Sequence, residues 1–278
     1  VQATMPTFSG AAILDGKFIS VEEGKGSFDL VIRISVLKKG RRVTIPTRRT
    51  AVLNKWLSKP GARLIQGCAL SEDALILWVE LPDEPARAEG EVVGLDIGVN
   101  KLITLSDGQQ PQFLGTTFKE VRDKIIRRTP GSKRRKRSLT ERNNLINQTL
   151  NQLPWSTFRA IGVEKLHDMK RGKQKDRGKT FRKAMAPWTY RQVLNRIQAK
   201  AQENRVLLVA VPPANTSREC PRPFCGKVSK DNRKGEEFRC ICCGYTADAD
   251  FVGATNVLVR TLSVLGSVES PRPQKVMI

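Results

Sequence analysis

The sequence predicts an α/β fold that carries a cysteine-rich insertion and follows a small β-rich domain. Residues 28–37 alternate apolar and polar side chains, as a half-buried strand does. From residue 91 onward, short apolar runs typical of strands alternate with longer helical patterns. Closely spaced cysteines interrupt this second region between residues 218 and 247. These three observations divide the chain into its predicted parts.

Residues 1–85 are predicted to form the small β-domain, which we expect to be a fragment of a β-barrel. Its first clear strand has a short apolar partner at residues 43–45. The apolar runs 62–70 and 74–81 flank a polar turn and predict a hairpin. Residues 82–90 then have the composition of a linker.

Residues 91–217 and 248–266 are predicted to form the α/β domain, and residues 267–278 an unstructured tail. Short turns separate its first three strands, which therefore form an antiparallel meander. Its elements follow in this order: strands 91–98, 101–106 and 111–114, helices 117–128 and 138–152, strand 158–164, helix 187–204, strand 206–211 and a last helix at about 250–265. This is the element order of the RNase H-like α/β fold.

The charge of the chain indicates a polyanionic partner. Its 49 Lys and Arg against 27 Asp and Glu give a net charge of +22. Residues 91–278 hold 36 of the basic and 17 of the acidic groups, so the polyanion should lie mainly against the second region. The longest strongly apolar run, residues 74–79, is far too short for a membrane span, and no signal peptide is visible. We therefore expect a cytoplasmic, nucleoid-associated protein that binds nucleic acid.

Three acidic residues stand at the margins of predicted elements: Asp96 and Glu164 end strands, and Asp250 opens the last helix. If the three carboxylates converge, their repulsion requires divalent cations. Two Mg²⁺ ions held in this way hydrolyse phosphodiesters. Taken singly, Asp96 could cap a turn and Asp250 a helix, and Asp248 is the next candidate for the third position.

The cysteines predict a structural zinc site with four protein ligands and no open coordination position. A glycine follows each pair, at Gly226 and Gly244, where it suits a tight turn. Two disulfides are the alternative, but a chain without an export signal belongs in a reducing compartment. Cys242 is a possible alternate ligand, and Cys68 is a predicted core residue. The predicted ligands are Cys220, Cys225, Cys240 and Cys243.

Two basic segments are predicted to bind nucleic acid and to be solvated loops in its absence, because they contain too few apolar residues for a core. Their residues are Lys133, Arg134, Arg135, Lys136 and Arg137 in the first, and Lys170, Arg171, Lys173, Lys175, Arg177, Lys179, Arg182 and Lys183 in the second. Four aromatic residues could stack on bases: Trp155, Phe181, Trp188 and Tyr190. For Trp188, core packing is at least as favoured. The single histidine, His167, is expected in a solvated loop.

Several ordered motifs in the second region resemble TnpB, the insertion-sequence nuclease family related to type V CRISPR effectors. They are the segments 92–100, 105–108, 162–166, 213–217 and 248–250, and the resemblance covers roughly residues 91–266. It implies a RuvC-like nuclease domain interrupted by a zinc ribbon. It also implies that Asp96, Glu164 and Asp250 bind two catalytic Mg²⁺ ions, and that the four predicted cysteines bind one Zn²⁺.

The resemblance further implies the partners of the chain. Residues 1–81 are similar to the later part of the family's wedge domain, which grips guide RNA and target duplex, and family members cut DNA under the direction of that guide. The chain departs from the family at Val252-Gly-Ala254, in its wide first cysteine pair and in the lack of a helical recognition segment before or within the β-domain. A truncated or reduced member is therefore expected. A non-cleaving guide-RNA or DNA binder, a mobile-element remnant and an unguided RuvC-like nuclease remain alternatives.

Overall fold

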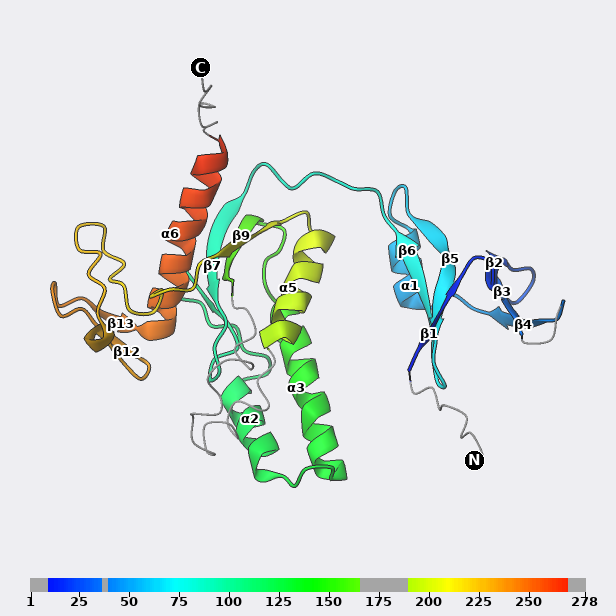
Figure 1. Ribbon diagram of the computed structural model, residues 1–278, viewed down its shortest axis with the longest axis horizontal. Coiled ribbons are helices and arrows are strands. Elements are labelled where there is room, and N and C mark those ends of the chain that lie inside the picture. The colour runs from blue at the N-terminus through cyan, green and yellow to red at the C-terminus, as the bar shows by residue number, and fades with distance from the viewer. Residues whose placement is uncertain (1–9, 37–39, 166–189, 270–278) are drawn as a thin grey trace, which may run out of the picture. The chain divides into compact units, whose positions relative to one another are not determined.

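The computed structural model describes residues 10–36, 40–165 and 190–269 of the chain, which divides into two compact units, residues 1–84 and 85–278 (Figure 1). Within the described residues, none of the helices has the length and apolar character needed to cross a membrane.

The first unit contains two three-stranded antiparallel sheets, β2-β3-β4 and β1-β5-β6. Its elements are β1 (Ala12–Asp15), β2 (Ile19–Glu23), β3 (Leu30–Ser35), β4 (Arg42–Thr47), α1 (Ala51–Leu57), β5 (Arg63–Leu70) and β6 (Leu75–Glu80). The predicted strand, its short partner and the hairpin are therefore confirmed as β3, β4 and β5–β6. Among the described strands the two sheets stay separate and do not close into one barrel.

Apolar side chains of β2, β3 and β5 form the core of this unit. Leu30 and Ile32 of β3 and Cys68 of β5 are almost fully buried, as the alternating pattern and the Cys68 prediction require. The Gln66 side chain joins the two sheets, because it accepts a hydrogen bond from the Val21 amide at 2.8 Å and donates one to the Val21 carbonyl at 2.9 Å.

The second unit is built on a four-stranded sheet of order β10-β9-β7-β8. Its strands are β7 (Glu91–Asp96), β8 (Thr104–Leu105), β9 (Phe158–Glu164) and β10 (Leu207–Val211). β9 runs parallel to both β7 and β10, and β8 is antiparallel to β7. Helices on both faces of this sheet confirm the predicted α/β class.

The predicted third meander strand, residues 111–114, is wrong. Only an isolated bridge joins Phe113 to Thr116. The intervening Leu114 and Gly115 have φ angles of 52° and 67°, in the left-handed region, so the chain turns back on itself there instead of extending.

Helices cover the two faces of the sheet (Figure 1). They are α2 (Phe118–Arg127), α3 (Lys133–Asn151), α5 (Tyr190–Glu203) and α6 (Ala249–Glu269). Side chains of α2, α3 and α5 pack with Leu95 and Val163 in the main core, whereas α6 packs with Ala160 and Val92 from the other face. This two-sided burial explains why β7 and β9 have nearly continuous apolar sequences.

Two glycines let α6 approach the sheet closely. A Cβ atom on Gly94 of β7 would lie 2.1 Å from the Ala254 carbonyl oxygen, and one on Gly162 of β9 would lie 1.8 Å from Thr261 Oγ1. No side chain fits at either position, so residues 254–261 of α6 pack directly against β7 and β9. This packing sets the place of Asp250.

A small sheet of order β11-β12-β13 leads directly into α6. It consists of β11 (Arg233–Lys234), β12 (Glu237–Arg239) and β13 (Thr246–Asp248), preceded by a short 3-10 helix, Lys230–Asn232. We call residues 218–247, which contain the two cysteine pairs, the ribbon segment.

Candidate metal centres

Asp96, Glu164 and Asp250 lie together at one end of the four-stranded sheet. β7 and β9 are parallel neighbours in which Leu95 pairs with Val163, so the next residues, Asp96 and Glu164, lie side by side as the last residues of the two strands. Asp250 is in the first turn of α6. A Cβ atom on Gly253, one turn further along, would lie 3.4 Å from the Asp96 carboxylate, so α6 and Asp96 are in close contact.

The electrostatics of this acidic cluster favour cation binding. Burial, followed by the charges of Glu164 and Asp250, raises the pKa of Asp96 to about 8. Burial also raises the pKa of Glu164 and of Asp250. Raised pKa values mean that the three carboxyl groups do not readily ionise together. A divalent cation stabilises their ionised forms, and carboxylate oxygens are suitable ligands for it.

Two basic side chains already face the cluster. Lys101 forms an ion pair with Asp248, and its Nζ lies 3.7 Å from Asp250 Oδ2. Arg233, on β11 of the ribbon segment, lies 3.5 Å from Asp250 Oδ1, and its charge opposes the raised pKa of all three acids. Both oxygens of Asp250 are therefore next to a positive charge of the protein.

Asp248, not Asp250, caps α6. Its Oδ1 accepts hydrogen bonds from the backbone amides of Asp250 at 3.0 Å and Phe251 at 3.2 Å. Although burial opposes the shift, Lys101 and these amides lower the pKa of Asp248. The alternative that Asp250 is an N-cap is therefore wrong, and its carboxylate remains turned toward the cluster.

A second set of contacts orients Glu164. The Thr216 hydroxyl donates a hydrogen bond to Glu164 Oε1. Asn256 of α6 holds the loop that carries Thr216, since its Nδ2 donates to the Thr216 carbonyl at 2.7 Å and to the Glu219 carbonyl at 2.8 Å. Thr216 is almost fully buried, at 3% exposure. Glu164 is thus held by a polar network that spans the loop after β10 and helix α6.

Sequence reasoning missed Thr216, Lys101 and Arg233 as members of this site. Thr216 lies in the 213–217 motif, so a signal was present. Arg233 is one basic residue among several in the ribbon segment, and only the folded chain brings it to the acids.

In metal-free protein, Asp96 is expected to make stability fall as the pH rises. Folding raises its pKa from 3.8 to about 8. Folding thus favours the protonated carboxyl, and this contribution is full below about pH 4 and lost as the pH rises toward 8. The melting temperature in EDTA should therefore fall between pH 5 and 8, and Asp96→Asn should flatten that part of the curve. Thermal unfolding across this range checks the expectation, and an equal slope in the variant contradicts it.

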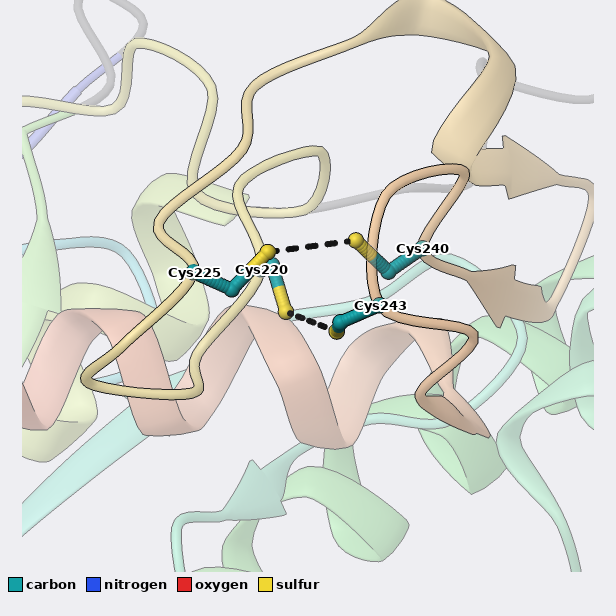
Figure 2. A group of neighbouring side chains, drawn as sticks. All are labelled: Cys220, Cys225, Cys240 and Cys243. Atoms are coloured by element: carbon teal, nitrogen blue, oxygen red, sulfur yellow. Dashed lines mark hydrogen bonds between the residues drawn. The ribbon is translucent and has the colours of Figure 1, made fainter.

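The four predicted cysteines form a compact group with all Sγ atoms within 4.8 Å of one another. Figure 2 shows the sulfurs of Cys220 and Cys225 turned toward those of Cys240 and Cys243. The Cys220–Cys243 and Cys225–Cys240 sulfur distances are both 3.6 Å. A tetrahedral ion with bonds of about 2.3 Å would place its sulfurs about 3.8 Å apart. A disulfide requires about 2.0 Å, so the thiols fit a bound metal such as zinc and not disulfides.

The local chain is built to hold this group. Gly226 and Gly244 have φ angles of 54° and 71°, so each predicted tight turn has the left-handed backbone that glycine adopts without strain. Buried Asn232 joins the two cysteine loops: its Nδ2 donates to the carbonyls of Arg218 and Lys227, and its Oδ1 accepts from the Ile241 amide. The site is therefore organised by the protein itself.

Cys242 is exposed and lies outside the compact group. Among the described residues, the three acids do not form an equally compact group of ligand atoms. Lys101 and Arg233 lie beside one of them instead.

The first basic segment is not a loop. Residues 133–137 form the first turns of α3, which Ser132 caps by accepting a hydrogen bond from the Arg135 amide. The segment is helical because this cap and the buried positions Leu145, Ile146 and Leu150 further along stabilise one continuous helix. Four of its basic side chains are exposed, whereas Arg135 donates to the carbonyls of Ile125 and Arg128 at the end of α2.

The other predicted contacts are placed as follows. The second basic segment, residues 170–183, lies outside the described residues, as do His167 and Trp188. Trp155 is in the core at 5% exposure and donates to the Leu150 carbonyl at 2.7 Å, so the expectation that it stacks on bases is wrong. Phe181 is likewise outside the described residues, and the hydroxyl of Tyr190 donates to the Glu164 carbonyl.

Known proteins resemble parts of this chain. Residues 190–257 match the family model described as the Cas12f1-like TNB domain. InsQ of Escherichia coli (strain K12), whose name describes a proposed RNA-guided DNA endonuclease, is 30% identical over 226 residues, 69% of this chain and 55% of InsQ. The CRISPR-associated endodeoxyribonuclease Cas12f1 of Sulfoacidibacillus thermotolerans is 34% identical over 76 residues, 27% of this chain and 18% of that protein.

A solved complex of Cas12f1 with sgRNA and target DNA aligns with 69% of this chain and 55% of its own chain, at 19% identity and a TM-score of 0.38. The chain spans about half the length of InsQ and a smaller share of the Cas12f1 relative.

Proposed function

We propose, on the premise that this chain belongs to the TnpB-like family, that it is an RNA-guided DNA endonuclease with a RuvC-type acidic centre. The observation that carries the proposal is the meeting of Asp96, Glu164 and Asp250 beside one end of the sheet. Their raised pKa values favour the binding of cations between them. The net charge of +22 suits a polyanionic substrate.

In this mechanism the three carboxylates would hold two Mg²⁺ ions, and these ions would supply activation of the attacking water and stabilisation of the leaving 3′ oxygen. Thr216 keeps Glu164 in position through its hydrogen bond. Asp248 caps α6, so Asp250 remains directed at the same place. Arg233, beside Asp250, is suited to face the negative charge of the phosphodiester that is cut.

The proposed function also assigns a role to each domain of the chain. We assign residues 91–217 and 248–266 to an RNase H-like, RuvC-type domain, supported by the sheet order β10-β9-β7-β8 and its single antiparallel edge strand. We assign residues 218–247 to a zinc ribbon that contacts target nucleic acid, supported by the tetrahedral spacing of its thiols. The first unit is proposed to be a wedge-like domain for guide RNA and target duplex.

The test is purification from the native host and sequencing of any RNA that stays bound. The same preparation then receives double-stranded DNA that matches this RNA, in Mg²⁺ or in EDTA. We expect bound RNA, cutting in Mg²⁺ and no cutting in EDTA. Absence of RNA overturns the guided part of the proposal, and cutting that persists in EDTA overturns its metal-dependent part.

A second candidate, a guide-RNA or DNA binder that does not cut, is favoured by one observation. Lys101 and Arg233 already neutralise Asp250, so the fold can tolerate the cluster without a metal. This candidate predicts bound RNA, DNA binding and no cutting in the same experiment.

Loss of the Thr216 hydroxyl is expected to weaken the metal centre. Groups that orient metal ligands typically contribute 10- to 100-fold to affinity or activity, so Thr216→Val should raise the Mg²⁺ concentration for half-maximal cutting by roughly that factor. The matched control is Thr255→Val, whose hydroxyl donates to the Phe251 carbonyl within α6. An unchanged Mg²⁺ dependence in Thr216→Val removes this residue from the centre.

A further inference from the structure

A pocket of about 210 Å³ lies next to the acidic cluster, between the loop after β7 and the ribbon segment. Residues 100–103 and 110–112 form one part of its lining, the beginning of α2 and the C-terminal half of α3 form another, and Glu236 reaches it from the turn between β11 and β12. Of the predicted site residues that the structure describes, none lies in it. The pocket therefore has no role in the mechanism described above.

The lining combines an apolar floor with a polar rim. Leu102, Ile103, Phe118 and Leu145 are each at most 6% exposed and line the pocket with apolar side chains. Gln110, Gln112 and Thr116 add amide and hydroxyl groups that both donate and accept hydrogen bonds. An apolar surface edged by such groups suits a planar heterocycle, whose faces are apolar and whose edges carry donors and acceptors.

The pocket is less suited to a phosphate group. The beginning of α2 is closed by its own capping box: Thr117 Oγ1 accepts from the Glu120 amide at 3.2 Å, and the Glu120 carboxylate accepts from the Thr117 amide at 2.9 Å. These amides are therefore occupied, and a carboxylate lies where an anion would have to bind.

The rim is held in place by contacts between distant segments. Asn100 Nδ2 donates to Glu236 Oε1 at 2.6 Å, and Arg122 donates to Asn100 Oδ1 at 2.6 Å. Lys101 is both a lining residue of the pocket and the ion-pair partner of Asp248 and Asp250.

We propose that this pocket receives one nucleobase of the DNA strand that passes the acidic cluster. The inference rests on the proposed function, because that function brings the strand to this place. The volume supports a base alone, since pockets for larger ligands measure about 300–1,000 Å³. Lys119, which is exposed at the pocket, supplies positive charge for a phosphate beside the base.

The test uses the full chain with Asp96→Asn, so that DNA is bound and not cut. Single-stranded DNA oligonucleotides carry the fluorescent base 2-aminopurine at one position, and the position is varied. We expect a change of fluorescence at one position only. The double substitution Gln110→Ala and Gln112→Ala should abolish this change and weaken binding roughly tenfold, as loss of a base contact does. The control is Gln202→Ala, at an exposed position in α5.

The outcomes separate this inference from the proposed function. If the parent chain binds no DNA, both fail. Only the pocket proposal is overturned if two results are found together. The first is that the chain with Asp96 intact binds and cuts DNA normally. The second is that the 2-aminopurine signal and the affinity of the Asp96→Asn chain are the same with and without the two glutamines. Gln112 is exposed, so the single Gln112→Ala variant keeps the test valid where the double variant unfolds, with a smaller loss expected.

Discussion

Asparagine in place of Asp96 is expected to reduce Mg²⁺-dependent DNA cutting by roughly a thousandfold. A catalytic metal ion contributes several kcal/mol to the stability of the transition state, and each 1.4 kcal/mol or so corresponds to about a tenfold change in rate. Asp96 faces both other acids and has a pKa raised to about 8, so its ionised form depends on a bound cation. The amide has the same size, and the contact with Gly253 is preserved.

The matched control for this experiment is Asp107→Asn. Asp107 is exposed in the turn after β8, where its Oδ1 accepts a hydrogen bond from the Gln109 amide at 2.8 Å. Asparagine retains that acceptor, so this variant should cut as the parent does. The measurement is the initial rate of cutting at saturating Mg²⁺. Parent-like cutting by Asp96→Asn removes Asp96 from the mechanism.

Serine in place of Cys240 is expected to abolish stoichiometric metal binding and to unfold the ribbon segment. Zinc contributes about 10–16 kcal/mol to the folding of small zinc modules, because the unfolded chain has no preformed site. Cys240 is 2% exposed, and its sulfur is 3.6 Å from that of Cys225. Although burial opposes the shift, backbone amides of Cys243 and Cys242 lower the pKa of Cys240 to about 6, which favours the thiolate form that binds metal.

Unfolding of the ribbon segment in Cys240→Ser should also disturb the acidic cluster. Arg233 lies in the ribbon segment, and the Ala249 amide at the start of α6 donates to the Glu236 carbonyl at 2.8 Å. Cys240→Ser should therefore lose cutting together with its metal. Metal content per chain and proteolysis within residues 218–247 measure the effect. Cys242→Ser is the control, since Cys242 is exposed and outside the group. One bound metal ion per chain in Cys240→Ser, or its loss in Cys242→Ser, contradicts the assignment.

Most strands of the fold could be predicted because their signals are local. Alternation in β3 and the apolar runs of β5, β6, β9 and β10 directly reflect which faces are buried. Helix α1 was not predicted, since it has only seven residues and no fully buried side chain. The predicted strand at 111–114 failed because the left-handed Leu114 and Gly115 turn the chain, and a short pattern carries no sign of that turn.

The candidate sites, like the strands, were predictable only where their signals in the sequence are local. The four cysteines are brought together by two short loops, so their spacing alone was informative. The acids could be proposed because each lies at the margin of a predicted element. Their counter-charges could not: Lys101 reaches Asp248 across 147 positions of sequence, and no local pattern separates it from the other lysines of a basic chain.

The sequence by itself determined most of the strands and helices, where the basic charge concentrates and which cysteines can share a metal, since periodicity, composition and short spacing act over a few residues. Only the tertiary structure decided that Asp248 caps α6, that Lys101 and Arg233 oppose Asp250, and that a pocket lies beside them. The physical reason is that folding brings together groups from distant parts of the chain, as the close packing of α6 on Gly94 and Gly162 does for Asp250.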